Sequence, residues 1–154
     1  MPAAQYNWDL HIENHYINEQ LNYDCMEERN KFLDRVVLLN QEQRDAYKQI
    51  MASVKNQQGR LFFLNGPGGT GKTYVYNTLS YKIHSEGWIV LCVASSGITA
   101  LLLRGGRTMT HSMFKIPVEG LTDESFFSIP KESLLAKMIC QTRLIIWDEA
   151  TMQH

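Results

Sequence analysis

The chain has 154 residues, of which 44% are hydrophobic and 20% charged, with a formal net charge of −1 at pH 7. This composition suits one domain with a hydrophobic core, and it argues against indiscriminate binding of nucleic acid through overall charge. No apolar run approaches the roughly 20 residues that cross a bilayer, and the polar N-terminus lacks a signal-peptide core, so we expect an intracellular protein without membrane contact.

The N-terminal part is acidic and weakly patterned. Residues 1–38 contain seven acidic and three basic residues, and the first 20 residues show no sustained hydrophobic period. We expect residues 1–38 to form a partly helical extension, loosely ordered at its start, with a helix over residues 22–37. Residues 39–154 are expected to form a separate unit.

That unit begins with an amphipathic helix, predicted over residues 41–57 with Asn40 as its N-cap. Its apolar positions share one face: Ala46, Ile50, Met51 and Val54. The apolar run at residues 61–64 then predicts a buried strand, and a helix is expected over residues 74–84. That helix would turn three apolar positions inward, namely Val75, Leu79 and Ile83.

Between the predicted strand and helix, residues 66–73 match the phosphate-binding loop pattern G-x-x-x-x-G-K-[ST] at every fixed position. The nucleotide-binding candidates are Gly66, Pro67, Gly68, Gly69, Thr70, Gly71, Lys72 and Thr73. Backbone N–H groups and the helix dipole would bind phosphates, Lys72 would contact the β and γ phosphates, and Thr73 would bind Mg²⁺. The alternative is a glycine-rich surface turn that carries Lys-Thr by chance.

Further elements follow the loop in alternation. A strand is predicted over residues 88–93, short helices over 98–103 and 131–139, and a last strand over 144–147. Solid apolar strands that alternate with helices indicate a parallel sheet with helices on both faces. The sequence therefore predicts an α/β fold of the P-loop NTPase class.

Two acidic residues, Asp148 and Glu149, follow the last predicted strand. Ligands of an open parallel sheet bind at the carboxyl ends of its strands, so Asp148 can lie beside the phosphate loop and hold Mg²⁺, directly or through water. Glu149 is then placed to orient or deprotonate the water that attacks the γ-phosphate. The alternative is a pair of acids that caps a following turn.

From residue 39 onward, the ordered series of motifs resembles the Pif family of superfamily-one DNA helicases, particularly the branch carried by Helitron transposons. The segments are LNQEQ at 39–43, FLN at 63–65, VASSGITALLL at 93–103, GGRT at 105–108, THSMF at 110–114 and IIWDEA at 145–150. The resemblance implies that residues 39–154 are the first part of a RecA-like motor domain. It also implies ATP-driven 5′-to-3′ translocation on single-stranded DNA, roles in DNA repair, recombination and telomere maintenance, and a nuclear location.

The resemblance assigns Gln43 to adenine recognition. The local alternative is a capping box with Asn40, and the two uses would require different rotamers. The family's DNA-contacting segments fall on residues 94–99 and 110–114. The resulting DNA-binding candidates are Ser96, Thr99, His111 and Phe114.

Charge supports part of this assignment, because residues 87–118 contain no acid and carry Arg104, Arg107 and Lys115, which can neutralise phosphates. Phe114 could stack on a base. The alternative places Phe114 in the core, together with the apolar residues of the short helix, Ile98, Leu101 and Leu102.

The resemblance stops just after Asp148 and Glu149. The γ-phosphate-sensing glutamine, the second RecA-like domain and its arginines have no counterpart, and an arginine finger alone contributes about 10³ to 10⁵ in rate. We therefore expect a truncated chain that is weak or inactive on its own, since unwinding needs the second domain. The alternatives are a fragment that binds Mg-ATP and single-stranded DNA without unwinding, and another P-loop enzyme such as a small-molecule kinase. The sequence predicts no oligomeric state.

Overall fold

The computed structural model describes residues 14–94, 96–105, 108–109, 113–115 and 128–148. Within these ranges, three parallel strands form a sheet in the order β2-β1-β3. The strands are β1 (Ile89–Ala94), β2 (Thr108–Met109) and β3 (Thr142–Asp148). β1 pairs with β3 from Ile89 opposite Thr142 to Ala94 opposite Asp148. The carboxyl ends of β1 and β3 therefore lie side by side.

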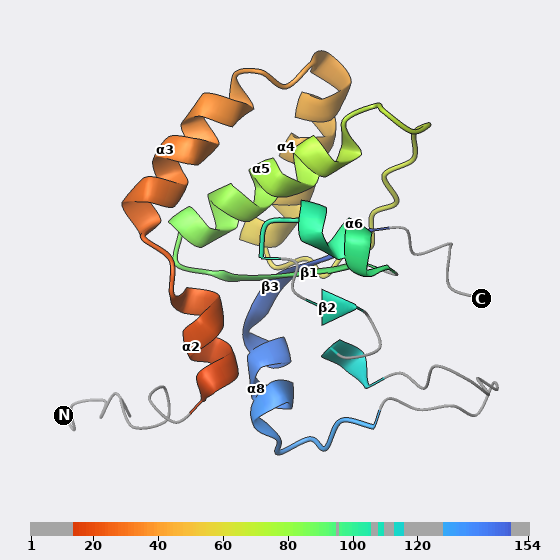
Figure 1. Ribbon diagram of the computed structural model, residues 1–154. Helices are drawn as coiled ribbons and strands as arrows, with labels where there is room; N and C mark the ends of the chain where they lie inside the picture. Colours follow the sequence, from red (N-terminus) through yellow and green to blue (C-terminus); the bar gives the residue numbers. More distant parts are fainter. Residues whose placement is uncertain (1–13, 95, 106–107, 110–112, 116–127, 149–154) are drawn as a thin grey trace.

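Helices cover both faces of this sheet (Figure 1). They are α2 (His15–Leu21), α3 (Cys25–Val36), α4 (Gln41–Lys55), α5 (Lys72–Ser85), α6 (Gly97–Leu102) and α8 (Leu134–Gln141). One face of β1 packs into a core with α4 and α5, and the other face packs against α2 and α8. Every residue of β1 is buried as a result. The structure confirms the predicted α/β fold with a parallel sheet.

The local signals in the sequence place most helices correctly. In α5, the predicted inward positions Val75, Leu79 and Ile83 are all buried. Asn40 caps α4, and its side chain and that of Gln43 form both bonds of a capping box. These elements are specified by neighbouring residues, which explains why their boundaries agree with the pattern to within a few positions. None of the described helices is long and apolar enough to cross a membrane.

The predicted strand over residues 61–64 is wrong. Its backbone pairs with no strand among the described residues, and Leu61 and Phe63 are 98% and 76% exposed. A cavity of about 690 Å³ lies between Phe62 and residues 140–144 at the start of β3. The apolar run packs one side on the core, but it has no neighbouring strand to complete the backbone hydrogen bonds of a sheet.

Two further expectations differ from the structure. Ile98, Leu101 and Leu102 of α6 are exposed, because this short helix buries the stripe formed by Ala100 together with Leu103 at its end. Residues 15–20, expected to be loosely ordered, instead belong to a helix, α2. Its N-cap, Asn14, is buried and donates to the carbonyl oxygen of Leu134 at 2.9 Å, which fixes α2 against α8.

Candidate nucleotide-binding site

The phosphate-loop candidate leads directly into α5. Gly69 and Gly71 both have φ of +80°, a backbone conformation that other residues rarely adopt, and Gly71 is the N-cap of α5. Thr70 Oγ1 donates to the carbonyl oxygen of Pro67 at 2.8 Å and closes the turn. Among the described residues no side chain caps this helix end, so its first N–H groups suit an anion.

Lys72 lies on the same turn. Its Nζ donates to the carbonyl oxygens of Gly66 at 2.6 Å and Pro67 at 3.1 Å. A phosphate oxygen would compete with these carbonyls for the ammonium group, and its bond would be the stronger one because both partners would be charged. The lysine is thus held at the loop by its neighbours and needs only a local rearrangement to contact a phosphate.

Gln43 connects α4 to the loop. Its Oε1 accepts from the backbone N–H of Asn40 at 3.0 Å, and its Nε2 donates to the carbonyl oxygen of Thr70 at 3.1 Å. The capping box is therefore formed while the same side chain contacts the phosphate-loop candidate. Recognition of adenine by Gln43 stays a prediction.

Gly71→Ala is expected to destabilise the protein by about 1–3 kcal/mol. An alanine would be strained at this φ, and its Cβ would lie 2.5 Å from Gln43 Nε2. Gly59→Ala is the matched control, because Gly59 has φ of +60° but no atom within 4 Å of the added Cβ. Urea unfolding of both variants measures the difference, and equal losses would show that the contact with Gln43 is unimportant.

Asp148 lies at the carboxyl end of β3, opposite Ala94, and is buried. Burial raises the pKa of the Tyr76 hydroxyl, and the negative charge of Asp148 raises it further. Tyr76 belongs to α5, so the charge of Asp148 acts on the hydroxyl of a side chain from the phosphate helix. A position of Asp148 beside the phosphate loop stays a prediction. Glu149 lies outside the described residues.

These residues fit a magnesium nucleotide. The glycine-rich loop leaves open space where Cβ atoms of Gly68 and Gly69 would stand, and Lys72 supplies a cation. Thr73 and Asp148 carry hard oxygen ligands of the kind that Mg²⁺ binds. Within the described residues there is no group of three or more His, Cys, Asp or Glu that could hold a metal. Mg²⁺ does not require one, because it keeps several waters and is also bound by substrate phosphates.

Some of the candidate DNA contacts lie at the surface and one is buried. Ser96 is the N-cap of α6 and accepts from the N–H of Thr99 at 3.2 Å, and the two hydroxyl oxygens lie 2.6 Å apart. Phe114 is buried and stacks on Trp147, with ring centroids 5.8 Å apart. The structure thus shows the core alternative for Phe114, whose ring is not presented to a base. His111 lies outside the described residues.

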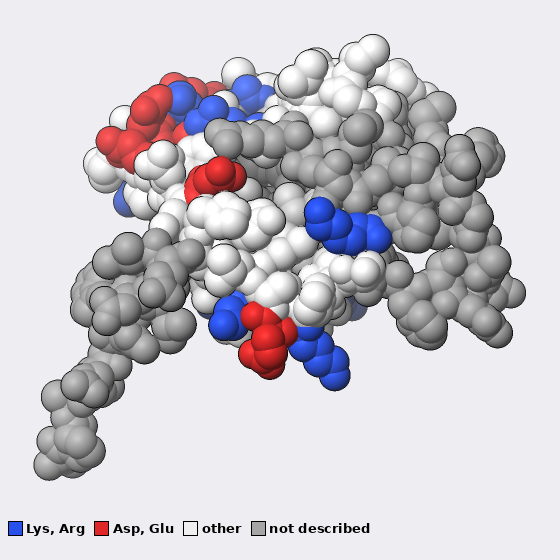
Figure 2. Space-filling model, turned by 60° about the horizontal axis from the view of Figure 1, so that its bottom comes forward, with Lys and Arg blue, Asp and Glu red and all other residues white. Residues whose placement is uncertain are grey.

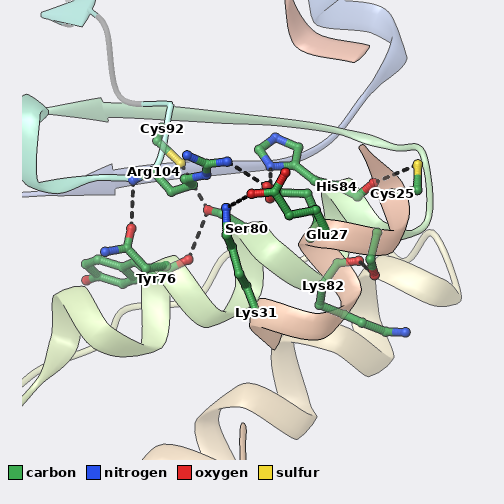
Figure 3. Close-up of polar contacts among 12 residues, drawn as sticks. Cys25, Glu27, Lys31, Tyr76, Ser80, Lys82, His84, Cys92 and Arg104 are labelled. Atoms are coloured by element: carbon green, nitrogen blue, oxygen red, sulfur yellow. Dashed lines mark hydrogen bonds and ion pairs between the residues drawn. The ribbon is translucent and has the colours of Figure 1, made fainter. Parts of the chain in front are cut away.

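Arg104 also differs from its expected role as a phosphate contact. Its Nη2 donates to Glu28 Oε1 at 2.5 Å, and His84 Nδ1 lies 3.3 Å from Glu28 Oε2. Figure 3 shows Arg104 and His84 pointing toward the same carboxylate. On the face shown in Figure 2, the described Lys and Arg side chains are interspersed with acids and do not gather into one basic patch.

The sequence contained a signal for this Glu28 cluster, which we define as Glu28, His84 and Arg104. The N-terminal extension is acidic, whereas residues 87–118 contain no acid. Opposite charges of this kind can indicate that two segments meet in the fold as well as that one of them binds nucleic acid. The sequence alone does not distinguish these two possibilities.

The stability of the protein is expected to fall as the pH is lowered below about 6.5, in part because of His84. Burial lowers the pKa of His84 from its usual value of 6.5, although Glu28 opposes the shift. Well above pH 6.5, His84 is neutral in both the folded and the unfolded protein. As the pH falls below 6.5, His84 of the unfolded protein takes up a proton first, so the free energy of unfolding decreases until the pH reaches the pKa of His84 in the folded protein. Urea unfolding at pH 7.5 and 5.5 measures this loss. His84→Gln should reduce the pH dependence, and an unchanged pH dependence in this variant would contradict the assignment.

Comparison with known proteins identifies the family of the chain. The family model described as PIF1-like helicase matches residues 38–154. The chain is 30% identical over 108 residues to ATP-dependent DNA helicase Pif1 of Psychrobacter sp. (strain PRwf-1), covering 70% of this chain and 16% of that protein. It is 32% identical over 123 residues to ATP-dependent DNA helicase PIF4 of Trypanosoma brucei brucei (strain 927/4 GUTat10.1), covering 75% and 14%. The chain thus spans about one sixth or less of the length of these relatives. With the phosphate-loop sequence inside the matched region, the chain belongs to the PIF1-like helicase family.

Proposed function

We propose that the chain is the ATP-binding part of an ATP-dependent DNA helicase. Residues 39–154 form the first part of a RecA-like motor domain, and residues 1–38 form its N-terminal extension. The observation that carries the proposal is the position of the loop at residues 66–73 at the start of α5, with Lys72 Nζ bonded to the loop carbonyls and Asp148 buried at the carboxyl end of β3. Family membership supports the helicase assignment.

In this proposal, each site residue has one role. Lys72 binds the β and γ phosphates, Thr73 and Asp148 hold Mg²⁺, and Gln43 contacts adenine. When bound, Mg²⁺ neutralises charge on the phosphates. Glu149 orients or deprotonates the water that attacks the γ-phosphate.

The proposed partner is single-stranded DNA, along which the whole protein translocates in the 5′-to-3′ direction. Ser96, Thr99 and His111 remain the candidate contacts, since Phe114 is buried and Arg104 is bound to Glu28. Unwinding requires a second RecA-like domain. The proposed processes are DNA repair, recombination and telomere maintenance in the nucleus. The alternative is binding of Mg-ATP and single-stranded DNA without unwinding.

Glu149→Gln is expected to leave Mg-ATP affinity within about twofold and to lower turnover about 100-fold, the lower end for loss of a general base. Equilibrium titration and phosphate release measure the two quantities. Glu42→Gln, an exposed acid in the first turn of α4, is the control. Equal turnover of Glu149→Gln and the unmodified chain would return Glu149 to a structural role.

A further inference from the structure

The Asn77 side chain of α5 forms hydrogen bonds with the backbone at the C-terminal end of α6. Asn77, the sixth residue of α5, accepts from the backbone N–H of Arg104 through Oδ1 at 2.7 Å. It also donates from Nδ2 to the carbonyl oxygen of Leu102 at 3.1 Å. Backbone groups at a helix end have no partner within the helix, so Asn77 supplies one from outside. The end of α6 is thereby bound to the phosphate helix.

A second set of contacts, made by the Arg104 side chain, fixes the same segment at the end of α6. The Arg104 guanidinium is bound to Glu28 of α3, and it lies 5.3 Å from the ring centroid of Tyr81 in α5 and 5.2 Å from that of Tyr23. The Glu28 side chain is 2% exposed. Residues 102–104 are therefore fixed through the backbone by α5 and through charge by α3.

These contacts link the helix that follows the phosphate-loop candidate to the helix that carries the candidate DNA contacts. α5 is continuous from Lys72, at the phosphate-loop candidate, to Ser85, and Asn77 lies between these two residues. A phosphate that draws Lys72 away from the loop carbonyls would change the loop at the start of α5. Because helices in a packed core move as units, a shift of α5 would move Asn77 and the end of α6 with it.

The other end of α6 carries the candidate DNA contacts. Ser96 caps α6, and Thr99 lies in its first turn. α6 has only six residues, so a displacement of its end at residues 102–104 reaches Ser96 without a flexible segment in between.

We propose that Asn77 is a positioning residue that couples nucleotide binding at the phosphate loop to the position of α6 and its candidate DNA contacts. The proposal rests on the proposed function. Coupling between two ligands is reciprocal, so nucleotide should change the affinity for DNA by the same factor as DNA changes the affinity for nucleotide.

Three variants separate coupling from folding. Asn77→Ala removes both hydrogen bonds, and alanine favours a helix, so α5 should remain intact. Asn77→Asp keeps an acceptor for the Arg104 N–H but loses the donor to Leu102. Lys82→Ala is the control on the same helix, because Lys82 pairs with Glu86 and not with residues 102–104.

The experiment uses the 154-residue chain, the non-hydrolysable analogue Mg-AMP-PNP and an oligo-dT single strand. Calorimetry gives the nucleotide affinity, fluorescence anisotropy gives the oligo-dT affinity with and without nucleotide, and amide hydrogen exchange follows residues 97–105. In the unmodified chain we expect nucleotide to change the oligo-dT affinity at least about fivefold and to alter exchange at residues 97–105. Asn77→Ala should bind nucleotide within about twofold of the unmodified chain but show an affinity ratio of about 1 and no exchange response. Asn77→Asp should be intermediate, and Lys82→Ala should be unchanged.

Normal coupling in Asn77→Ala would overturn the inference while leaving the proposed function intact. A lower unfolding midpoint with unchanged coupling would likewise reduce Asn77 to a structural residue. If the unmodified chain bound nucleotide but its residues 97–105 did not respond, the inference would also fail. Absence of nucleotide binding in calorimetry would overturn the proposed function, and the inference with it.

Discussion

Lys72→Ala is expected to weaken binding of Mg-ATP by about 100-fold or more. In the structure, Lys72 Nζ lies at the loop, within hydrogen-bond distance of the Gly66 and Pro67 carbonyls. In the complex the same ammonium would bind phosphate oxygens, and hydrogen bonds to charged groups contribute about 1.5–3 kcal/mol each. Equilibrium titration with Mg-ATP measures the loss.

The control for Lys72→Ala is Lys82→Ala, which removes the same charge from the same helix away from the loop. Its affinity should match that of the unmodified chain. Unchanged affinity in Lys72→Ala would refute the phosphate-loop assignment. Equal losses in both variants would indicate a general effect of positive charge on α5.

Arg104→Ala is expected to destabilise the protein by about 3–5 kcal/mol, because it leaves a buried carboxylate without its charged partner. The Glu28 side chain is 2% exposed and that of Arg104 is 32% exposed. Glu28→Gln removes the buried charge, whereas Arg104→Ala leaves it without its partner. Glu28→Gln is therefore expected to lower the free energy of unfolding less than Arg104→Ala does. Urea unfolding of the two variants measures this order.

The double variant Glu28→Gln with Arg104→Ala tests the same pair further. Removal of the buried charge should restore part of the stability lost in Arg104→Ala, which gives a coupling energy between the two positions. Additive losses would contradict a direct interaction. If Arg104 were instead a DNA phosphate contact, Arg104→Ala would weaken binding of oligo-dT with little loss of stability.

The sequence predicted those parts of the fold that depend on neighbouring residues. The loop at residues 66–73 and the helix after it are specified by a local pattern, and the structure places them together. The run at residues 61–64 has the composition of a strand, but a strand also needs a partner, and residue pattern does not show whether a partner is present. In α6, apolar composition suggested burial, whereas only one stripe of so short a helix reaches the core.

In the site too, the sequence predicts contacts between neighbouring residues and does not predict contacts between residues far apart in the chain. Asn40 and Gln43 are three residues apart, and this spacing is typical of the capping box that they form. Glu28 and Arg104 are 76 residues apart, and no local pattern pairs them. Basic residues in an acid-free stretch suggested phosphate binding, but one of them neutralises a buried acid of the N-terminal extension. Within the described part of the extension, α3 packs against the phosphate helix.

Mg-ATP turnover by the 154-residue chain, with and without oligo-dT, tests the central claim most directly. We predict slow turnover that oligo-dT stimulates, with both rates lost in Lys72→Ala. This result would show that one chain contains a nucleotide site coupled to a DNA site. Turnover that persists in Lys72→Ala, or that oligo-dT does not change, would contradict this account.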